Sequence, residues 1–387
     1  MFLNRVLMSL KEVKVSNLRL VFLGGGSNSA VGQAHFTASQ MDGNFEVVGG
    51  LFNRNSEAND LSSTRYRIPR NMVFASLSEI IERKNEFDVV AILTPTPNHF
   101  ENLVPLINAQ IPVICEKSVT SSLKEAIEIE TLTSKMESDL FVTFNYIGYP
   151  MVRLMRHLVS SGKLGELISI RVKMPQEGFI RQDRVTGRVN PPQLWRQSDG
   201  EIPTILLDLG VHVLHLASFA TGMNPSGVFS RFGNHSFMKG LVDEVEILAE
   251  YANGMIGSFW VSKTALGEQN GLEIEIFGSH GSVAWKQVEP NKLRNANQHG
   301  EVNEIRFGQG FPIVDEPRYN RFKPGHPGGF IEAFANLYED IRVNMTSANL
   351  TNGGADFAPG ISQAKQGLQI LEASVKSHQA REWVPVQ

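Results

Sequence analysis

The fold is decided by one stretch near the start of the chain, residues 18–32, which reads LRLVFLGGGSNSAVG. The mostly apolar run 18–23 predicts a buried strand, and the glycine cluster after it predicts a tight turn into a helix over residues 30–40. Gly24 and Gly26 supply the first two glycines of a dinucleotide-binding fingerprint, and Gly32 follows about three residues late for the third. A glycine-rich turn without a ligand is the alternative.

The first 145 residues continue this alternation of strands and helices. Apolar runs predict strands at 45–51, 88–93, 112–115 and 140–144, and helical periodicity predicts helices at 77–83, 98–108 and 121–135. Continuous apolar strands separated by helices are typical of a parallel sheet covered on both faces. We therefore predict an α/β protein with a dinucleotide-binding Rossmann domain over residues 17–147, preceded by an extension at 1–16.

The pattern changes after residue 150. Period-two strands are predicted at 167–173, 245–251, 255–261, 272–277 and 282–286, with a hairpin turn at Asn253-Gly254. Helices are predicted at 151–160, 204–222 and 361–378, a loop at 290–310 and a flexible surface connection at 346–356. These elements predict a second α/β domain over residues 148–387 with a large, mostly antiparallel sheet. One face of that sheet needs a cover, so we expect a homodimer or homotetramer.

Composition excludes several classes of protein. Hydrophobic residues make up 42% and charged residues 20% of the 387 residues, and the net charge is −4. This is ordinary for a globular protein, with no basic stripe for nucleic acid and no apolar run of the roughly 18 residues that a membrane span needs. The one cysteine, Cys115, permits no internal disulfide and fits a reducing, cytoplasmic location. No metal site is expected.

Candidate cofactor residues follow the predicted strands. The first turn supplies Gly24, Gly26, Ser27, Asn28 and Gly32. The second strand ends at Asn53-Arg54 without the carboxylate that favours NAD, and Arg54 is able to neutralise a 2′-phosphate, so we expect NAD(P) with NADP slightly favoured. A solvated turn arginine is the alternative.

Two further strand ends add polar residues at the same edge of the sheet. The segment after the third apolar strand supplies Thr94, Pro95, Asn98 as a helix N-cap and His99 as a cofactor neighbour. Glu116 and Lys117 follow strand 112–115, where ligands bind in open α/β sheets. Lys117 is able to hold a substrate hydroxyl, although a surface Lys-Glu pair is the alternative.

A later helix carries the second half of the predicted site. Asp208 and His212 lie four residues apart on one face, and His215 lies on the same stripe. Histidine has the reference pKa, about 6.5, that suits proton transfer near neutrality. Asp208 is expected to orient His212 or to bind a second hydroxyl. Gly210, inside the helix, suggests close approach of another backbone or a cofactor ring. A polar helix face at an interface is the alternative.

These motifs together resemble the Gfo/Idh/MocA oxidoreductase family (glucose–fructose oxidoreductase, inositol dehydrogenase and relatives). The resemblance runs from about residue 17 over nearly the whole chain. It rests on residues 32–35, 94–99, 116–117, 145–153, 195–196, 208–212, 268–272 and 324–334. It implies that Lys117 binds the reacting hydroxyl, His212 is the acid/base and Asp208 assists, with Asn145 as a further cofactor contact. Substrates in such enzymes are sugars, sugar derivatives or cyclitols.

The chain departs from the family pattern at three places. Ser118 replaces the usual proline of Glu-Lys-Pro, and residues 201–206 replace the glycine-rich segment that is common before the Asp-x-x-x-His helix. His215 stands where Asp or Asn is common. Trp195, Arg196 and His326 are second-tier candidates for the substrate pocket. Arg181, Arg184, Arg188 and Arg196 lie in one loop that is able to receive an anionic substrate, with a solvated loop as the alternative.

The predicted reaction is NAD(P)-dependent oxidation or reduction of a ring carbinol of a sugar or cyclitol. Two alternatives remain open. The first is a hydrolase or lyase that retains its cofactor and shows no net redox change. The second is a regulatory protein that binds dinucleotide without turnover, as does a yeast galactose regulator that resembles this family.

Overall fold

The computed structural model describes residues 17–323, 325–346 and 357–387. The predicted extension at 1–16 and nearly all of the predicted connection at 346–356 lie outside the described residues. Among the described helices, none combines the length and the apolar character needed to cross a membrane.

The first sheet is parallel, as predicted, and its five strands lie in the order β2-β1-β3-β4-β5. Its strands are β1 (Leu18–Gly24), β2 (Phe45–Leu51), β3 (Val89–Leu93), β4 (Val113–Cys115) and β5 (Leu140–Val142). The connecting helices are α2 (Ala30–Gln40), α3 (Ser56–Tyr66), α4 (Leu77–Glu82), α5 (His99–Asn108) and α6 (Leu123–Met136). Helix α3 was not predicted, because the face that it buries includes the polar residues Asn59, Ser62 and Ser63.

The second sheet has nine strands in the order β13-β12-β11-β10-β6-β9-β8-β7-β14 and is mostly antiparallel. Its strands are β6 (Leu167–Pro175), β7 (Gly227–Gly233), β8 (Glu244–Glu250), β9 (Ile256–Ser262), β10 (Glu273–Gly278), β11 (Gly281–Lys286), β12 (Lys292–Asn297), β13 (Val302–Arg306) and β14 (Val384–Pro385). The predicted loop at 290–310 is wrong, because it contains β12 and β13. These two strands, of which β13 is the edge of the sheet, bury little besides Leu293 and Ile305, so they carry a weak apolar signal.

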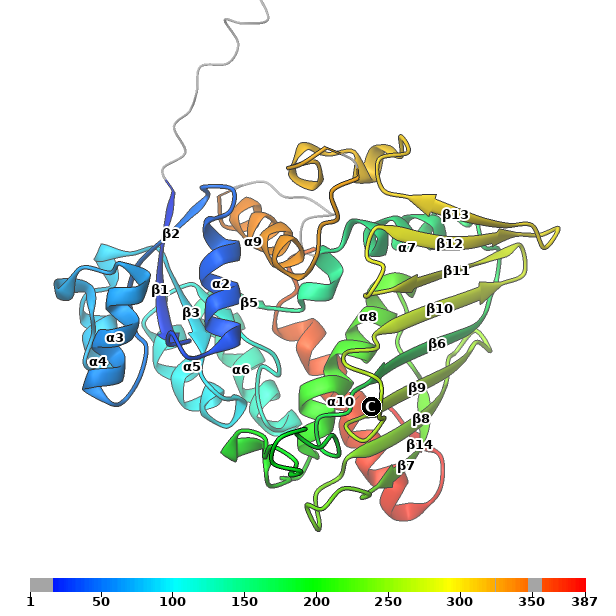
Figure 1. Cartoon of the computed structure of the whole chain (residues 1–387), viewed down its shortest axis with the longest axis horizontal. Helices are drawn as coiled ribbons and strands as arrows, with labels where there is room; N and C mark the ends of the chain where they lie inside the picture. The colour runs from blue at the N-terminus through cyan, green and yellow to red at the C-terminus, as the bar shows by residue number, and fades with distance from the viewer. Residues whose placement is uncertain (1–16, 324, 347–356) are drawn as a thin grey trace, which may run out of the picture.

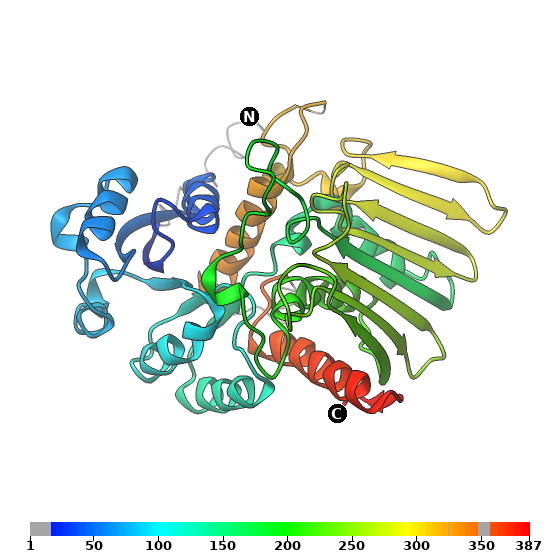
Figure 2. The same cartoon turned by 60° about the horizontal axis from the view of Figure 1, so that its bottom comes forward.

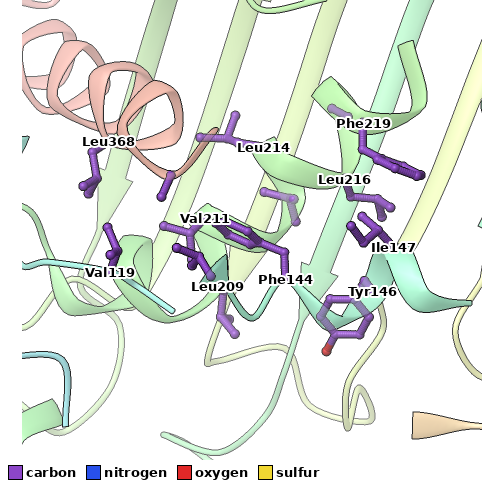
Figure 3. Close-up of a cluster of buried hydrophobic side chains, with 14 of the residues drawn as sticks. Val119, Phe144, Tyr146, Ile147, Leu209, Val211, Leu214, Leu216, Phe219 and Leu368 are labelled. Atoms are coloured by element: carbon purple, nitrogen blue, oxygen red, sulfur yellow. The ribbon is translucent and has the colours of Figure 1, made fainter. Parts of the chain in front are cut away.

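Helices α7 (Pro150–Ser160), α8 (Val211–Thr221) and α10 (Ile361–Ala380) lie on one side of the large sheet (Figure 1). Figure 3 shows apolar side chains of α8, such as Leu214, meeting Leu368 of α10 and Phe144 and Ile147 of the segment after β5. This cluster fixes α8 against the end of the nucleotide-binding sheet. The start of α8 is therefore held rigidly at the boundary of the two sheets.

The helix predicted over residues 204–222 begins irregularly. Leu206–Gly210 forms a π-helical turn, a rare feature that often marks functional sites, and α8 follows it. A Cβ on Gly210 would lie 3.1 Å from Cδ2 of Leu371 in α10 and 3.0 Å from Cδ2 of Leu206. The close neighbour of Gly210 is thus a packed helix, and the expectation that a cofactor ring approaches it is wrong.

Helix α9 (Phe330–Thr346) belongs to the C-terminal half of the sequence but packs on the first sheet (Figure 1). Asn336 donates a hydrogen bond of 2.8 Å to the main-chain oxygen of Gly148, and the buried Arg153 pairs with Asp340 of α9. The predicted domain boundary at residues 147 and 148 stays a prediction. Part of the second segment nevertheless completes the core of the first.

Candidate active site

A cavity of about 830 Å³ lies where the C-terminal edge of the first sheet faces the second domain. Its wall is formed by the glycine-rich turn, the ends of β2, β3 and β4, and the short helix Leu194–Arg196. Figure 2 shows the green segment around residues 180–200 running across from the second domain to the first. Residues from both halves of the chain therefore enclose one space.

The glycine-rich turn is shaped so that backbone atoms form the cavity wall. Gly24 and Gly25 have positive φ angles of 88° and 67°, and Gly24, Gly26 and Asn28 line the cavity. A Cβ on Gly32 would lie 2.0 Å from the oxygen of Gly25, so only glycine permits this packing of helix α2 on the turn. The start of α2 thus presents backbone amides as a pyrophosphate requires.

Ser27 has a different role from the one expected. It does not line the cavity, and its amide donates to Oγ of Ser62 in α3 (3.0 Å). Its main-chain oxygen accepts a hydrogen bond of 2.8 Å from Gln33. Ser27 therefore fixes the turn, and Ser29 caps α2 by accepting from the amide of Gly32 (3.1 Å).

Asn53 and Arg54 line the cavity after β2, where the glycine-rich fingerprint predicts that the adenosine of a dinucleotide would lie. Asn53 accepts a hydrogen bond of 2.9 Å from the amide of Asn55. Among the described residues, Arg54 has no hydrogen-bond or ion-pair partner. A cation at the cavity wall without an internal partner is suited to a ligand phosphate.

The loop after β3 divides its predicted residues between cavity and core. Thr94, Pro95 and Asn98 line the cavity, and Asn98 occupies the N-cap position of α5 without a side-chain capping bond. His99 is fully buried, and each ring nitrogen lies 2.7 Å from a carbonyl oxygen, one of Thr94 and one of Ser118. His99 does not line the cavity, contrary to expectation, and instead ties two of its loops together.

Glu116 lines the cavity and is held by residues that sequence reasoning did not connect. His35, in α2, lies 3.0 Å from Oε1 of Glu116 and 2.8 Å from the hydroxyl of Tyr338 in α9, and Thr143 donates to the same carboxylate oxygen. Burial raises the pKa of Glu116, but His35, the charge of Lys117 and the hydroxyl of Thr143 together outweigh this and hold it below its usual range. Glu116 is thus a fixed carboxylate at the rim.

Lys117 meets Asp208 across the two domains, as the sequence predicted. Its Nζ donates to the main-chain oxygen of Asp208 (2.8 Å) and to Oδ1 (3.1 Å). The peptide bond between Lys117 and Ser118 is cis. Lys117 lines the cavity, whereas Asp208 and His212 are 7% exposed and lie behind that wall.

Asp208 is surrounded by cations instead of contacting His212. Besides Lys117, its carboxylate accepts from Lys263 (2.9 Å to Oδ2) and from Arg196 (3.3 Å to Oδ2 and 3.0 Å to Oδ1). Burial raises the pKa of Asp208, but these three charges hold it well below its usual range. Asp208 is therefore an ionised anchor. The expectation that it orients His212 is wrong, because no hydrogen bond joins the two among the described residues, and the expectation that it binds a second hydroxyl stays a prediction.

Lys263 was missed by the sequence analysis. It directly follows β9, is 8% exposed, and also donates to Oε1 of Gln176 (2.7 Å). Burial lowers its pKa against the opposing attraction of Asp208. The only sequence feature that marked Lys263 was its position at the end of a hairpin strand, and nothing in the sequence linked it to Asp208.

His212 has a ring nitrogen, Nδ1, that is buried without a hydrogen-bond partner among the described residues. The ring packs edge-on against Tyr146, with centroids 4.7 Å apart. Burial, reinforced by the charge of Lys117, holds the pKa of His212 well below its usual value. His212 is therefore a neutral imidazole, oriented by packing, with capacity for a hydrogen bond that the protein does not use.

The remaining candidates are placed differently. Trp195 and Arg196 line the cavity, with the guanidinium of Arg196 4.0 Å from the Trp195 ring centroid. Asn145 does not line it, but its buried Nδ2 has no partner among the described residues. His215 stacks on Phe144 at 3.9 Å. His326 lies in a separate exposed loop and does not line the cavity, contrary to expectation.

Comparisons with known proteins agree with this geometry. Residues 18–144 match the model of an oxidoreductase family with an NAD-binding Rossmann fold, and residues 152–284 match the GFO/IDH/MocA C-terminal domain. YfiI, an uncharacterized oxidoreductase of Bacillus subtilis, is 26% identical over 95% of this chain and 96% of its own. The levoglucosan dehydrogenase of Pseudarthrobacter phenanthrenivorans is 25% identical over 78% of this chain and 80% of its own.

The fold has counterparts among solved structures. An inositol dehydrogenase homolog from Azotobacter vinelandii, crystallised with NAD+, superposes with a TM-score of 0.85 at 25% identity, covering 96% of this chain and 98% of the other. The two-sheet fold is therefore shared with an inositol dehydrogenase homolog that was crystallised with NAD+.

Proposed function

Because this chain belongs to the GFO/IDH/MocA family of oxidoreductases, we propose that it is a dehydrogenase that transfers a hydride between a nicotinamide dinucleotide and a ring carbinol of a sugar, sugar derivative or cyclitol. The observation that carries the proposal is the contact of Lys117 with Asp208, 2.8 Å and 3.1 Å, four residues before His212. This contact joins the edge of the nucleotide-binding sheet to the helix that carries the imidazole.

The chain's own residues fit a dinucleotide. The glycine-rich turn offers amides for the pyrophosphate, and Glu116, Lys117 and the unpartnered amide of Asn145 are the candidates at the nicotinamide end. When bound, the cofactor supplies the hydride acceptor or donor. NADP is the preferred form in this proposal because Arg54 has no partner in the part of the chain that the structure describes, and no carboxylate occupies the residues beside it.

In the proposed reaction, Lys117 donates a hydrogen bond to the reacting hydroxyl and His212 accepts its proton. His212 is neutral at neutral pH because burial holds its pKa well below the usual value, so a lone pair is available. The ammonium of Lys117 stabilises the developing negative charge on the oxygen. Trp195 and Arg196, which line the cavity, exclude water and contact the substrate.

The large sheet is also proposed to be the site of self-association. Its open face carries Leu248 of β8 (45% exposed) and Ile256 of β9 (62% exposed), whereas α7, α8 and α10 cover only the other face (Figure 1). Exposed apolar side chains on an uncovered sheet face suit a second copy of the chain.

The deciding experiment titrates the purified protein with NADH and NADPH and then screens sugars and cyclitols with the preferred cofactor. We expect absorbance of the reduced nicotinamide to appear with at least one polyol and NADP+. Cofactor that stays bound while a sugar is cleaved or dehydrated without a net absorbance change identifies a lyase or hydrolase. Binding of dinucleotide with no chemistry on any sugar identifies a regulatory protein.

A further inference from the structure

The catalytic end of the cavity holds more positive than negative charge. Lys117, Lys263 and Arg196 all contact the carboxylate of Asp208, and no other carboxylate among the described residues bonds to any of the three. Glu116 is the residue before Lys117 and is a second carboxylate at this end of the cavity. Its pKa is lowered because the contacts with His35 and Lys117 outweigh the effect of burial, and its Oε1 is bonded to His35 and Thr143. Three cations against two anions leave at least one positive charge without a counterpart.

This excess is buried, which makes it costly. Asp208 and Lys263 are 7% and 8% exposed, and the side chains of Lys117 and Arg196 are 15% and 25% exposed. The remaining acceptors at the cluster are neutral, since Lys263 donates to Gln176 and Arg196 donates to Gln193. A buried cation without an anion is unfavourable unless a ligand completes the site.

Two of the three cations face the space that a substrate enters. Lys117 and Arg196 both line the cavity, and both contact the same oxygen, Oδ1 of Asp208, at 3.1 Å and 3.0 Å. An ammonium and a guanidinium that share one carboxylate oxygen lie close together. Between them they offer donors of the kind that bind carboxylate and phosphate oxygens.

We propose that the substrate is anionic: a sugar or cyclitol that carries a carboxylate or phosphate group, received by Arg196, with Lys117 bound to the reacting hydroxyl beside it and Lys263 as the buried support. The inference rests on the proposed function and names the substrate class of the same site. The competing explanation is that the positive charge serves only the developing alkoxide of a neutral sugar. In that case charge on the substrate brings no gain in binding.

The test uses the full-length protein saturated with NADPH. Calorimetry measures the binding of D-glucose, D-glucuronate and D-glucose 6-phosphate to it. We expect at least one anion to bind about tenfold tighter than glucose at low salt, with the advantage falling as salt is raised. Preference for the uronate or for the phosphate tells which anion the site accepts. Glucose binding as tightly as both anions, or no binding of either anion, overturns the inference.

Matched variants locate the effect. Arg196→Gln removes the anion preference, and Arg196→Lys, which keeps the charge, retains part of it. Arg294→Gln removes an equal charge from an exposed position of β12, away from the cavity, and leaves the preference unchanged. Equal behaviour of Arg196→Gln and Arg294→Gln overturns the inference.

The two proposals fail separately. Oxidation of neutral sugars in preference to anions upholds the dehydrogenase and removes the anionic substrate. Tight binding of an anionic sugar that never exchanges a hydride with either cofactor upholds the anion site and removes the dehydrogenase.

Discussion

Lys263 reaches Asp208 from the end of β9 and donates a hydrogen bond of 2.9 Å to its Oδ2, while Lys117 donates to Oδ1 from the end of β4. Elements of both sheets are thus joined through one carboxylate. The same arrangement places two ammonium groups near His212, and both charges lower its pKa alongside burial. Lys263 is therefore expected to influence proton transfer without touching the substrate.

Lys263→Met tests this influence. Loss of a positive charge near His212 raises the pKa of the imidazole, because like charges disfavour its protonated form. We expect the acidic limb of the pH profile of kcat/KM to move to higher pH, so that kcat/KM on that limb falls at a given pH. Lys173→Met, on the open sheet face, is the control and leaves the profile in place. A profile that does not move in Lys263→Met assigns Lys263 a purely structural role.

Asp208→Asn tests the anchor itself. The substitution leaves Lys117, Lys263 and Arg196 without their shared anion in a buried site. Removal of one partner from a buried ion pair typically costs about 3–5 kcal/mol, and we expect the free energy of unfolding in urea to fall by that amount. Asp183→Asn, at an exposed turn, should cost far less. Equal stability of the two variants would show that the cluster is not under charge strain.

His212→Asn separates catalysis from binding. We expect kcat to fall about a thousandfold because the general base is removed, while the affinity for the dinucleotide stays within twofold. His326→Asn, in a loop outside the cavity, should retain full activity. Unchanged activity or biological output of His212→Asn favours the regulatory alternative.

The sequence predicted the parts of the fold that carry a strong periodic signal. The buried runs of β1 and β3 and the capped helix α6, where Ser122 accepts from the amide of Glu125, were readable from apolar spacing and cap residues. The position of Lys117 followed from the rule that ligands bind at the carboxyl edge of a parallel sheet, whereas its grouping with Asp208 in one site followed from the family resemblance.

The rest depends on contacts that leave no periodic trace. Helix α3 buries serines and an asparagine, with Asn59 bonded to the backbone of Phe52 and Phe74. Strand β13 is the edge of the large sheet, and both it and the neighbouring β12 bury few side chains, so their apolar signal is weak. Lys263 is a single residue whose partner lies 55 positions earlier on another element, so no local pattern reveals the pair.

His215→Phe tests a pH effect on stability. Burial, with a contribution from Arg156, lowers the pKa of His215 to about 3. An unfolded chain, with a histidine pKa of about 6.5, binds the proton more readily, so the stabilising contribution is full above pH 6.5 and is lost as the pH falls towards 3.

Between pH 7 and pH 5 this histidine accounts for a loss of about 2 kcal/mol in the free energy of unfolding. Phenylalanine retains the stacking on Phe144 and does not titrate, so the loss measured for His215→Phe should be smaller by that amount. His299→Phe, at an exposed position, should leave the pH dependence unchanged. The same slope in wild type and His215→Phe would contradict the assignment.

Arg54→Gln tests the expected cofactor preference. Arg54 lines the cavity beside Asn53 and has no partner among the described residues, so its charge is available to a 2′-phosphate. Removing one charge-assisted contact of this kind typically costs about 1.5–3 kcal/mol, so we expect the Kd for NADPH to rise at least tenfold and the Kd for NADH to change less than twofold. Raising the salt concentration should narrow the difference between the wild-type affinities for the two cofactors. Arg70→Gln, on the same domain but outside the cavity, is the matched control. An equal loss of affinity for both cofactors in Arg54→Gln would mean that Arg54 contacts a group that NADH and NADPH share, and the preference for NADP would have to be abandoned.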